Sequence, residues 1–360
     1  MENNFKRITI KIGSNVLTKK DGSLDFTRMS ELVDQISELH KQGVEIIIVS
    51  SGAVAGGRSK VLADKLDPVS ARQLFSAIGQ VKLINRYYML FRDNNITCGQ
   101  VLTTKESLST RGHYLNQRNC MQVMIDNGVI PIVNENDTIS VTELMFTDND
   151  ELSGLVATMM DAEALIILSN IDGIYNGNPN DPDVEVIREV LPGKRDLSSY
   201  IQTSKSSFGR GGMQTKTNIA GKVADEGVEV IIANGKKNGI LIDLLTKREE
   251  TLCTRFIPSS EGASSIKKWL AHSDDFAKGE IHVDENARKA LLGDTATSVL
   301  PVGVTSIKGN FEEDDIVKII DENGVQIGVG KTQYDSEKAR LLIGKKGERP
   351  LVHYDYLYLV

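Results

Sequence analysis

Cysteine and histidine are scarce in this sequence, and the scarcity excludes several classes of site. The three cysteines, Cys98, Cys120 and Cys253, are widely spaced, odd in number and form no CxxC pair. Neither a disulfide framework nor a zinc site is expected from such a set. The five histidines lie outside the glycine- and aspartate-rich stretches described below, so Ser/His/Asp catalysis is not expected either.

Long apolar runs are also missing. The longest aliphatic runs, at 46–49 and 164–168, have the length of a buried strand, and the N-terminal residues contain no apolar signal-peptide core. We therefore expect no membrane association, no secretion and a cytoplasmic location. A net charge of −7 also gives the molecule as a whole no electrostatic tendency toward nucleic acid.

What the sequence does contain is typical of a globular protein with two domains. Its 360 residues are 40% hydrophobic and 25% charged, which argues against disordered and coiled-coil classes. A chain of this length is long for one ordinary domain. A large unit with a smaller appendage is therefore expected.

The first 258 residues alternate between strand and helix patterns. Aliphatic strand-like segments are followed by segments with apolar residues at helical spacing, which predicts an α/β domain with a mostly parallel sheet and covering helices. The predicted strands are 7–12, 44–49, 129–133, 164–168 and 228–232, and the predicted helices are 26–39, 70–92, 150–161 and 214–226.

The pattern changes near residue 258. A stretch rich in Ser and Gly leads into a polar segment, so 259–276 is predicted to be a linker between a domain at 1–258 and a module at 277–356. Short alternating segments separated by Gly, Asp and Asn predict that this module is compact and β-rich. The segments are 280–283, 316–320, 325–330 and 340–343.

Two stretches that follow predicted strands have the composition of anion-binding turns. In KIGSNVLT (11–18), Lys11 leaves a strand beside a glycine, where a lysine and backbone amides can reach a phosphate. In VSSGAVAGGR (49–58), small residues permit close approach of backbone N–H groups to an anion. A tight strand-to-helix turn would have the same composition.

Further polar clusters follow other strands. NENDTIS (134–140) and FTDNDELS (146–153) combine amides with carboxylates, which suits either a zwitterionic ligand or solvated turns. GRGGMQTK (209–216) is a glycine loop ending in a lysine at a predicted helix start, a pattern that grips triphosphates or forms a surface loop. SNIDGIYNGNP (169–179) is a candidate nucleoside contact or a turn.

Taken together and in this order, these strings resemble the bacterial glutamate 5-kinase family, and the resemblance covers the whole chain. It rests on KIGSNVL, VSSGAVAGGR, PIVNENDTIS, the DND at 148–150, SNIDGIY and GGMQTK. Members have an amino-acid kinase domain, an αβα sandwich, and often a C-terminal PUA domain, which IHVDENARKALL and SVLPVGVTSIKGNFEEDD resemble here.

The resemblance implies roles for individual residues. Lys11 and Lys216 would be catalytic. ATP contacts would come from Lys11, Ser169, Asn170, Arg210, Gly211, Gly212, Met213, Gln214, Thr215 and Lys216. Glutamate would be bound by Ser51, Asp137 and Asn149, and the same stretches add Gly52, Ala53, Asn134, Asp148 and Asp150 as candidates. The family also implies ATP with Mg²⁺, the first step of proline biosynthesis, feedback inhibition by proline and a homo-oligomer, a dimer or tetramer; the metal ligands stay open.

Two positions depart from the family pattern. Asn170 stands where relatives usually carry an Asp that is thought to orient the catalytic lysines, and Arg210 stands where a small residue is usual. Asp148, Asp150 and Asp172 are candidates for the orienting role. Arg210 would add a phosphate contact or lie in solvent.

Alternative functions remain open at this point. Within the same fold, N-acetylglutamate, aspartate or UMP could be the acceptor, although a free ammonium group favours pairing with Asp137. A protein that binds RNA through the PUA-like tail is a different class. Residues 277–356 carry 11 Lys and Arg against 14 Asp and Glu, so their net charge of −3 disfavours RNA binding.

Overall fold

The computed structural model divides the chain into two compact units, Met1–Gly262 and Ala263–Val360. The residues that it describes are 5–58, 66–139, 146, 149–178, 181, 184–193, 197, 213–260, 265–293 and 297–359.

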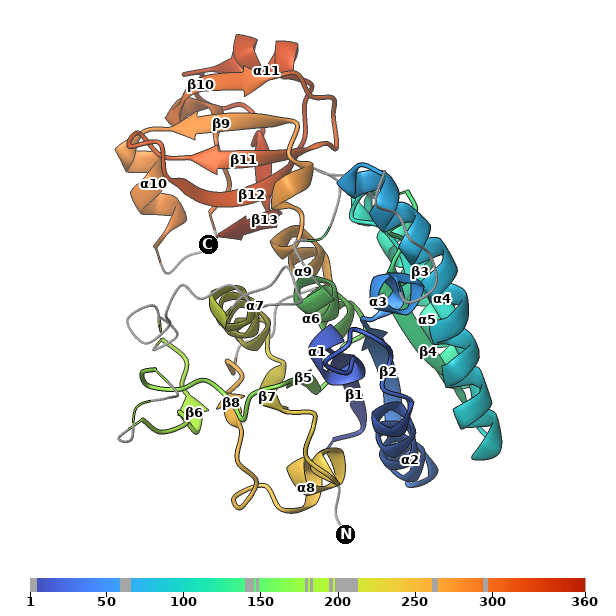
Figure 1. The fold of residues 1–360 in the computed structure, drawn as a ribbon. Coiled ribbons are helices and arrows are strands. Elements are labelled where there is room, and N and C mark those ends of the chain that lie inside the picture. Colours follow the sequence, from blue (N-terminus) through green and yellow to red (C-terminus); the bar gives the residue numbers. More distant parts are fainter. Residues whose placement is uncertain are drawn as a thin grey trace. The chain divides into compact units, whose positions relative to one another are not determined.

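The first unit is built on an eight-stranded sheet with the order β3-β4-β2-β1-β5-β7-β8-β6 (Figure 1). All neighbouring strands are parallel except β7 and β8, which are antiparallel. The mostly parallel sheet is therefore confirmed. The strands are β1 (Arg7–Ile12), β2 (Glu45–Ser50), β3 (Thr97–Thr103), β4 (Val129–Glu135), β5 (Ala164–Ser169), β6 (Glu189–Val190), β7 (Glu229–Asn234) and β8 (Thr254–Phe256).

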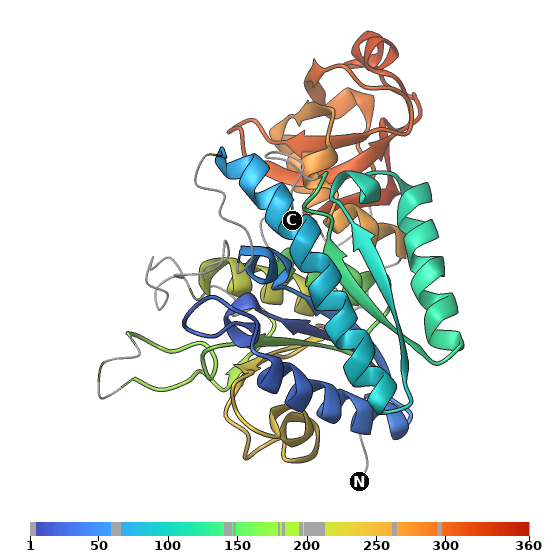
Figure 2. The ribbon, with the colours of Figure 1, turned by 45° about the vertical axis from the view of Figure 1, so that its right-hand side comes forward.

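Helices cover both faces of this sheet. One face carries α2, α4 and α8, and Figure 2 shows α2 and α4 lying across it. The other face carries α6 and α7, which contact each other. The helical segments are α1 (Ser14–Leu17), α2 (Phe26–Lys41), α3 (Ala53–Arg58), α4 (Pro68–Asp93), η1 (Glu106–Leu108), α5 (Arg111–Asp126), α6 (Asn149–Met159), α7 (Met213–Asp225) and α8 (Ile240–Thr246).

The core follows from the period-two geometry of the strands. Ile8, Ile10 and Ile12 of β1 are fully buried and belong to the cluster with α2, α4 and α8. Leu165 and Ile167 of β5 point the opposite way and belong to the cluster with α7. Since successive side chains of a strand alternate between faces, aliphatic runs bury residues on both sides. The αβα sandwich is thereby confirmed.

Side-chain caps define where the long helices begin. Asp25 accepts a hydrogen bond from the backbone N of Arg28 at the start of α2. Asp67 accepts from the backbone N of Val69 and Ser70, and Pro68 occupies the first turn of α4. Such caps satisfy backbone donors that the first helical turn leaves unpaired, and proline lacks that donor altogether.

The second unit contains a five-stranded sheet with the order β10-β9-β11-β12-β13, antiparallel except for the pair β9 and β11. The predicted β-rich module is confirmed. Its elements are α9 (Ser265–Ala271), η3 (Asp274–Phe276), β9 (Gly279–Val283), α10 (Glu285–Leu291), η4 (Pro301–Gly303), β10 (Val304–Gly309), β11 (Ile316–Ile320), β12 (Gln326–Thr332), α11 (Ser336–Leu342) and β13 (Val352–Leu359).

Two expectations for this region differ from the structure. The stretch 259–276, expected to be a linker, contains α9, whose Trp269 and Leu270 are buried and which packs against β13. The segment 340–343, expected to be one of the short β segments, overlaps the end of helix α11. Asp335 caps that helix by accepting from the backbone N of Lys338, and the cap favours helix over strand.

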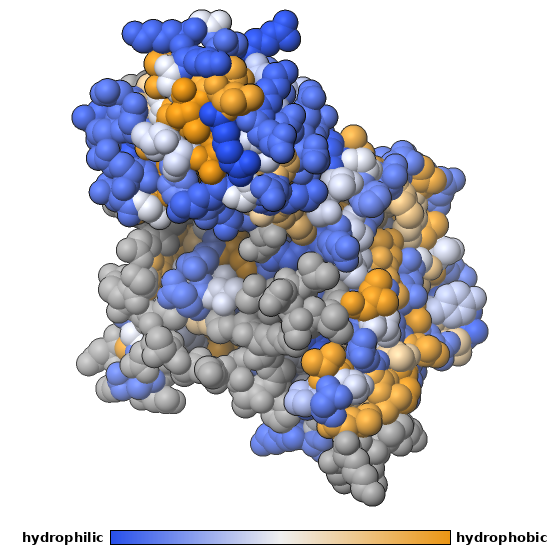
Figure 3. Space-filling view, turned by 90° about the horizontal axis from the view of Figure 1, so that it is seen from above, coloured by the Kyte–Doolittle hydropathy of each residue, from blue (hydrophilic) through white to orange (hydrophobic). Residues whose placement is uncertain are grey.

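The surface of the second unit carries apolar side chains among charged ones (Figure 3). Leu300, Val302 and Leu341 are exposed, and α11 packs against η4 and β10. Beneath the surface, a separate apolar core includes Ile281, Val317 and Val329.

Candidate active site

The predicted site residues gather at the carboxyl ends of four adjacent parallel strands. Lys11 lies near the end of β1, with Val49 of β2 and Ile167 of β5 as its neighbours in the sheet. Asn134 lies near the end of β4, and Ser169 ends β5. Open α/β sheets bind ligands at this edge, so the topology itself brings these distant segments together.

A buried carboxylate joins the two predicted catalytic lysines. Lys11 Nζ lies 2.5 Å from Asp150 Oδ1, and Lys216 Nζ lies 2.7 Å from Asp150 Oδ2. Asp150 is the second residue of α6, and α6 packs against both β1 and α7, the elements that carry the lysines. One side chain therefore sets the positions of two cations from segments about 200 residues apart.

The two lysines favour the ionised form of the Asp150 carboxyl. Burial raises the pKa of the Asp150 carboxyl, but the ammonium groups of Lys11 and Lys216 outweigh it and hold that pKa well below its usual range. Asp150 is 0% exposed, so its charge depends on the two lysines. The site therefore combines two positive charges with one negative charge, and has a net positive character.

This arrangement bears on the departure at Asn170. Asn170 is exposed, and its side-chain oxygen lies 3.5 Å from Ser169 Oγ. Asp172 is engaged elsewhere, with Lys237 Nζ at 2.8 Å and Asn234 Nδ2 at 3.0 Å. Among the described candidates, Asp150 is thus the one that contacts both lysines, and it was also a candidate for binding the substrate. Asp148, the third candidate for orientation, lies outside the described residues.

Asn149, the first residue of α6, connects three of the segments predicted to bind substrate. Its Nδ2 lies 3.1 Å from the carbonyl oxygen of Ser50, 3.0 Å from Ser51 Oγ and 3.0 Å from Asn134 Oδ1. An amide nitrogen has two protons for three acceptors, so these contacts are shared. Asn149 ties the loop after β2 to the end of β4.

The turn after β2 depends on glycine. Gly52 has φ +106°, a conformation that other residues rarely adopt, and a Cβ there would lie 3.3 Å from a methyl group of Leu24. The backbone N–H of Ser51 donates to the carbonyl oxygen of Ile12 at 3.0 Å. This N–H is already engaged within the protein, so in this turn the backbone amides of Gly52 and Ala53 are the candidates for receiving an anion.

Close helix packing supports the same turn. A Cβ on Gly79 of α4 would lie 1.7 Å from the carbonyl oxygen of Ala53, and one on Gly57 would lie 1.9 Å from that of Phe75. Glycines at these two positions let α3 and α4 meet backbone to backbone. In the GAVAGGR string, Gly57 thus serves helix packing.

Asp137, predicted to hold a substrate ammonium group, lies directly after β4 and has two partners on α4. Arg72 Nη2 forms an ion pair with Asp137 Oδ1, and Ser76 Oγ lies 3.3 Å from Oδ2. The same Arg72 nitrogen lies 3.4 Å from Glu135 Oε2. Sequence reasoning missed Arg72 and Ser76, for which the available signal was their four-residue spacing on a predicted helix.

The predicted ATP-binding residues divide into described and undescribed groups. Ser169 ends β5 and is buried, while Met213, Gln214, Thr215 and Lys216 form the first turn of α7. Arg210, Gly211 and Gly212 lie outside the described residues. The described part places a strand end and a helix start on the same side as the two lysines.

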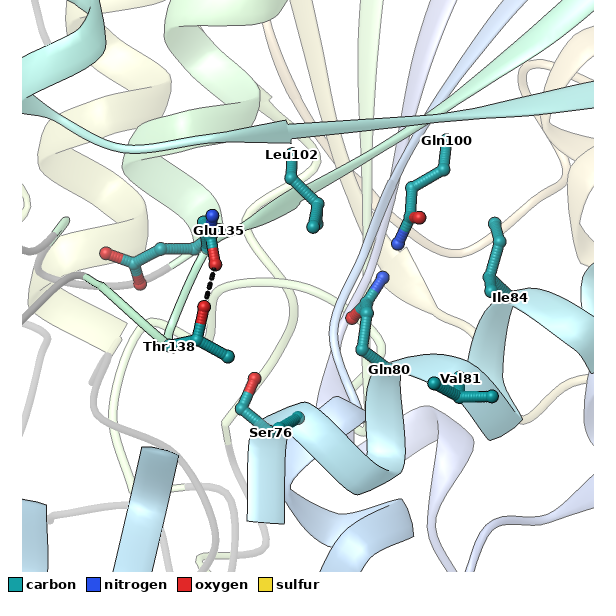
Figure 4. A pocket seen from close by; sticks show the side chains of 10 residues that line it. Ser76, Gln80, Val81, Ile84, Gln100, Leu102, Glu135 and Thr138 are labelled. Carbon is teal, nitrogen blue, oxygen red and sulfur yellow. Dashed lines mark hydrogen bonds between the residues drawn. The ribbon is translucent and has the colours of Figure 1, made fainter. Parts of the chain in front are cut away.

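A cavity of about 290 Å³ adjoins the surroundings of Asp137. Figure 4 shows Ser76 and Gln80 of α4 on one side and Glu135 and Thr138, from the end of β4 and the following turn, on another. Gln80 Oε1 accepts a hydrogen bond from Asn134 Nδ2 at 2.9 Å. The cavity thus shares its walls with the residues around Asp137 and Asn134.

Two kinds of feature are absent from the described part of the chain. None of the helices found there is long and apolar enough to cross a membrane. The same residues contain no cluster of three or more His, Cys, Asp or Glu side chains able to hold a metal ion.

Comparison with known proteins identifies relatives of both units. Residues 6–234 match the model of the amino acid kinase family, and residues 279–354 match that of the PUA domain.

Similar full-length proteins include a glutamate 5-kinase of Bacteroides thetaiotaomicron, 68% identical over 360 residues, with all of both chains covered. A glutamate 5-kinase of Chlorobaculum tepidum is 45% identical over 362 residues, covering 99% of this chain and 98% of its own. Among solved structures, carbamate kinase from Giardia lamblia bound to AMP-PNP has a TM-score of 0.53 at 17% identity. That match covers 72% of this chain and all of the other, and it supports the fold alone.

Proposed function

We propose that this chain, which belongs to the glutamate 5-kinase family of amino acid kinases, transfers the γ-phosphate of ATP to the γ-carboxylate of free glutamate. The product would be L-glutamyl 5-phosphate, in the first step of proline biosynthesis. The observation that carries the proposal is the pair of lysines held on one buried carboxylate, Asp150.

The chemistry of the acceptor explains why lysines are needed. A carboxylate is already ionised near neutral pH, so its attack on a phosphate requires no general base. The obstacle is repulsion between anions, about 4 kcal/mol for two unit charges 4 Å apart at an effective dielectric constant of about 20. That corresponds to roughly a thousandfold in rate. Lys11 and Lys216, which are both held on Asp150, would offset this repulsion as charge moves between the two oxygens.

The other end of glutamate is an ammonium and a carboxylate. Asp137 would pair with the ammonium group, and Ser51 and Asn149 would hold the substrate beside the lysines. The Asn149 contacts to Ser51 and Asn134 support this assignment because they place those side chains around one point. N-acetylglutamate, which lacks the ammonium charge, aspartate, which is shorter, and UMP are the alternative acceptors.

ATP would lie between the end of β5 and the start of α7, with Ser169, Asn170 and the turn from Met213 to Lys216 beside it. We propose that Mg²⁺ is held chiefly by the nucleotide phosphates, because Asp150 is already engaged with both lysines. When bound there, Mg²⁺ would neutralise part of the phosphate charge. The lysines would supply the remaining positive charge around the phosphoryl group.

We also propose that the regulation and the assembly of this chain are those of its family. We expect feedback inhibition by proline, a homo-oligomer that is a dimer or a tetramer, and a cytoplasmic location. The PUA domain is expected to contribute little to RNA affinity, because its net charge is negative.

One experiment tests the acceptor directly. ADP release by the full-length chain would be measured with ATP, Mg²⁺ and, in turn, glutamate, N-acetylglutamate, aspartate and UMP. Glutamate is expected to give the highest kcat/KM by a wide margin. Equal or faster turnover with another acceptor would replace glutamate in the proposal.

A further inference from the structure

We propose that Arg72 is a positioning residue for glutamate recognition, which holds the Asp137 carboxylate in the orientation that receives the substrate ammonium group. The inference rests on the proposed function, because Asp137 is assigned there to the ammonium. Arg72 belongs to α4 and lies 65 residues from Asp137 in the sequence.

The contacts of Asp137 define its orientation. Arg72 Nη2 binds Oδ1, while Ser76 Oγ lies 3.3 Å from Oδ2, so each carboxylate oxygen has its own partner on α4. Asp137 is 7% exposed. A buried carboxylate held at both oxygens cannot turn freely, and its remaining lone pairs therefore point in a defined direction.

Arg72 also separates two negative charges. Its Nη2 contacts Glu135 Oε2 at 3.4 Å as well as Asp137, so both carboxylates lie around the same nitrogen. Without the guanidinium group the two carboxylates would repel each other at short range. Glu135 is anchored by its other oxygen, which accepts from the backbone N of Phe146 at 2.9 Å. Asp137 is therefore the carboxylate that is expected to move.

Helix α4, which carries Arg72, contacts the end of β4 and the following turn through several side chains. Arg72, Ser76 and Gln80 are spaced by four residues, which places them on one face of α4. That face contacts Asp137 through the first two residues and Asn134 through the third. Gln73 adds a hydrogen bond of 2.8 Å from its Nε2 to the carbonyl oxygen of Thr138. The turn after β4 is thus fixed to a rigid element.

The test compares Arg72→Met, Arg72→Lys and the double variant Arg72→Met/Glu135→Gln in the full-length chain. Arg72→Met is expected to raise the glutamate KM about tenfold or more, as expected for losing a hydrogen bond to a charged group. The KM for ATP and the kcat should change by less than about threefold, since the residue acts on the acceptor site. Arg72→Lys keeps the positive charge, so its glutamate KM should lie between those of Arg72→Met and the unaltered chain.

The double variant separates positioning from simple packing. The amide introduced by Glu135→Gln can still accept from the backbone N of Phe146 but carries no charge to repel Asp137. The glutamate KM should therefore recover by about threefold or more relative to Arg72→Met. Arg92→Met is a matched control, because Arg92 lies at the far end of α4 with its side chain 54% exposed. It should leave both KM values unchanged.

Each other result has a definite meaning. An unchanged glutamate KM in Arg72→Met, or no recovery in the double variant, would overturn the inference. Parallel losses in ATP binding and thermal stability would also overturn it, because they indicate a purely structural role. Absence of glutamate-dependent ADP release from the unaltered chain would instead refute the proposed function.

Discussion

Gly79 and Ala53 meet backbone to backbone, and a Cβ on Gly79 would lie 1.7 Å from the Ala53 carbonyl oxygen. Ala53 begins α3 and adjoins the turn of Gly52, so α4 supports the candidate substrate turn directly. Because the obstructing atom belongs to the backbone, a larger residue at position 79 cannot be accommodated by rotating a side chain.

Gly79→Ala is therefore expected to separate α3 from α4. The free energy of unfolding should fall by about 1–3 kcal/mol, the usual cost of overpacking, and the glutamate KM should rise. Urea unfolding and initial rates would measure the two effects. Gly112→Ala is the control, because a Cβ on Gly112 in α5 meets no described atom within 4 Å. Equal changes in the free energy of unfolding and in the glutamate KM for the two variants would contradict the packing role of Gly79.

Lys216→Ala should lower kcat far more than it changes the glutamate KM. The Lys216 charge is needed most while the phosphoryl group is between donor and acceptor, so a loss of about a hundredfold or more in kcat is expected. Lys11→Ala should behave similarly. Steady-state kinetics with Lys222→Ala, a lysine in the last turn of the same helix, provides the comparison. A change in the glutamate KM without a change in kcat would contradict the catalytic role of Lys216.

Asp150→Asn should release both lysines and reduce kcat. It also has a signature in the pH dependence of stability, because the pKa of Asp150 is lowered in the folded state. A lowered pKa contributes stability above the unfolded pKa, about 3.9, and that contribution is lost as pH falls below it. Between pH 6 and pH 3, the free energy of unfolding should fall more steeply with decreasing pH for the unaltered chain than for Asp150→Asn. Urea unfolding at a series of pH values would measure this difference.

The companion change Asn170→Asp addresses the departure from the family pattern. Since Asp150 already contacts both lysines, this change is expected to leave kcat within about twofold. A large increase in kcat would mean that the lysines lack support in the natural sequence.

Asp137→Ala should raise the glutamate KM steeply and leave ATP affinity nearly intact, because its partners lie on the acceptor side. The loss of a charged pairing predicts an effect of about tenfold or more. Initial rates with each substrate varied in turn would measure it. A parallel drop in ATP affinity would place Asp137 on the phosphates or the metal.

The PUA domain is expected to be dispensable for phosphoryl transfer, since every described catalytic candidate belongs to the first unit. Truncation after residue 262 is preferable to truncation at 258, because Ser259 donates from its backbone N to the carbonyl oxygen of Ala224. Kinase assays on the shortened chain and RNA titrations of residues 263–360 would test both halves. A soluble but inactive kinase unit, or salt-sensitive submicromolar RNA binding, would contradict them.

The elements that sequence analysis found are those with a strong apolar pattern. β1 has isoleucine at every second position, and β2 and β5 are aliphatic runs; all three agree with the predicted bounds within one residue at each end. β3 was not predicted, because this edge strand (TCGQVLT) contains polar residues and a glycine and has Val101 and Leu102 in succession, so apolar and polar residues do not alternate in its sequence. The segment 340–343 is predicted as a β segment but overlaps the end of helix α11, because a short apolar run fits either structure.

The predicted site residues lie at strand ends or were suggested by the family resemblance, as were Asn149, Asp150 and Lys216 on helices, whereas Arg72 and Ser76 of α4 were not predicted. The carboxyl ends of parallel strands lie at the same edge of a sheet, so the proximity of Lys11 and Asn134 can be predicted from the sequence. The partner of Asp137 could not be chosen in this way, because an arginine within a long helix usually belongs to a solvated face. Arg72 becomes a candidate once the packing of α4 on the sheet is known.

Asn149 and Asp150 are consecutive residues, yet the first contacts the segments assigned to the acceptor and the second contacts the lysines assigned to the donor. A single trans peptide keeps their Cα atoms about 3.8 Å apart. On the proposed assignments, the spacing between acceptor and donor would be set by a covalent bond at the start of α6, and its precision would not depend on how far apart the loops lie in sequence. Any perturbation that rotates this one helical turn should misalign both substrates together, so their defects would appear coupled in kinetics.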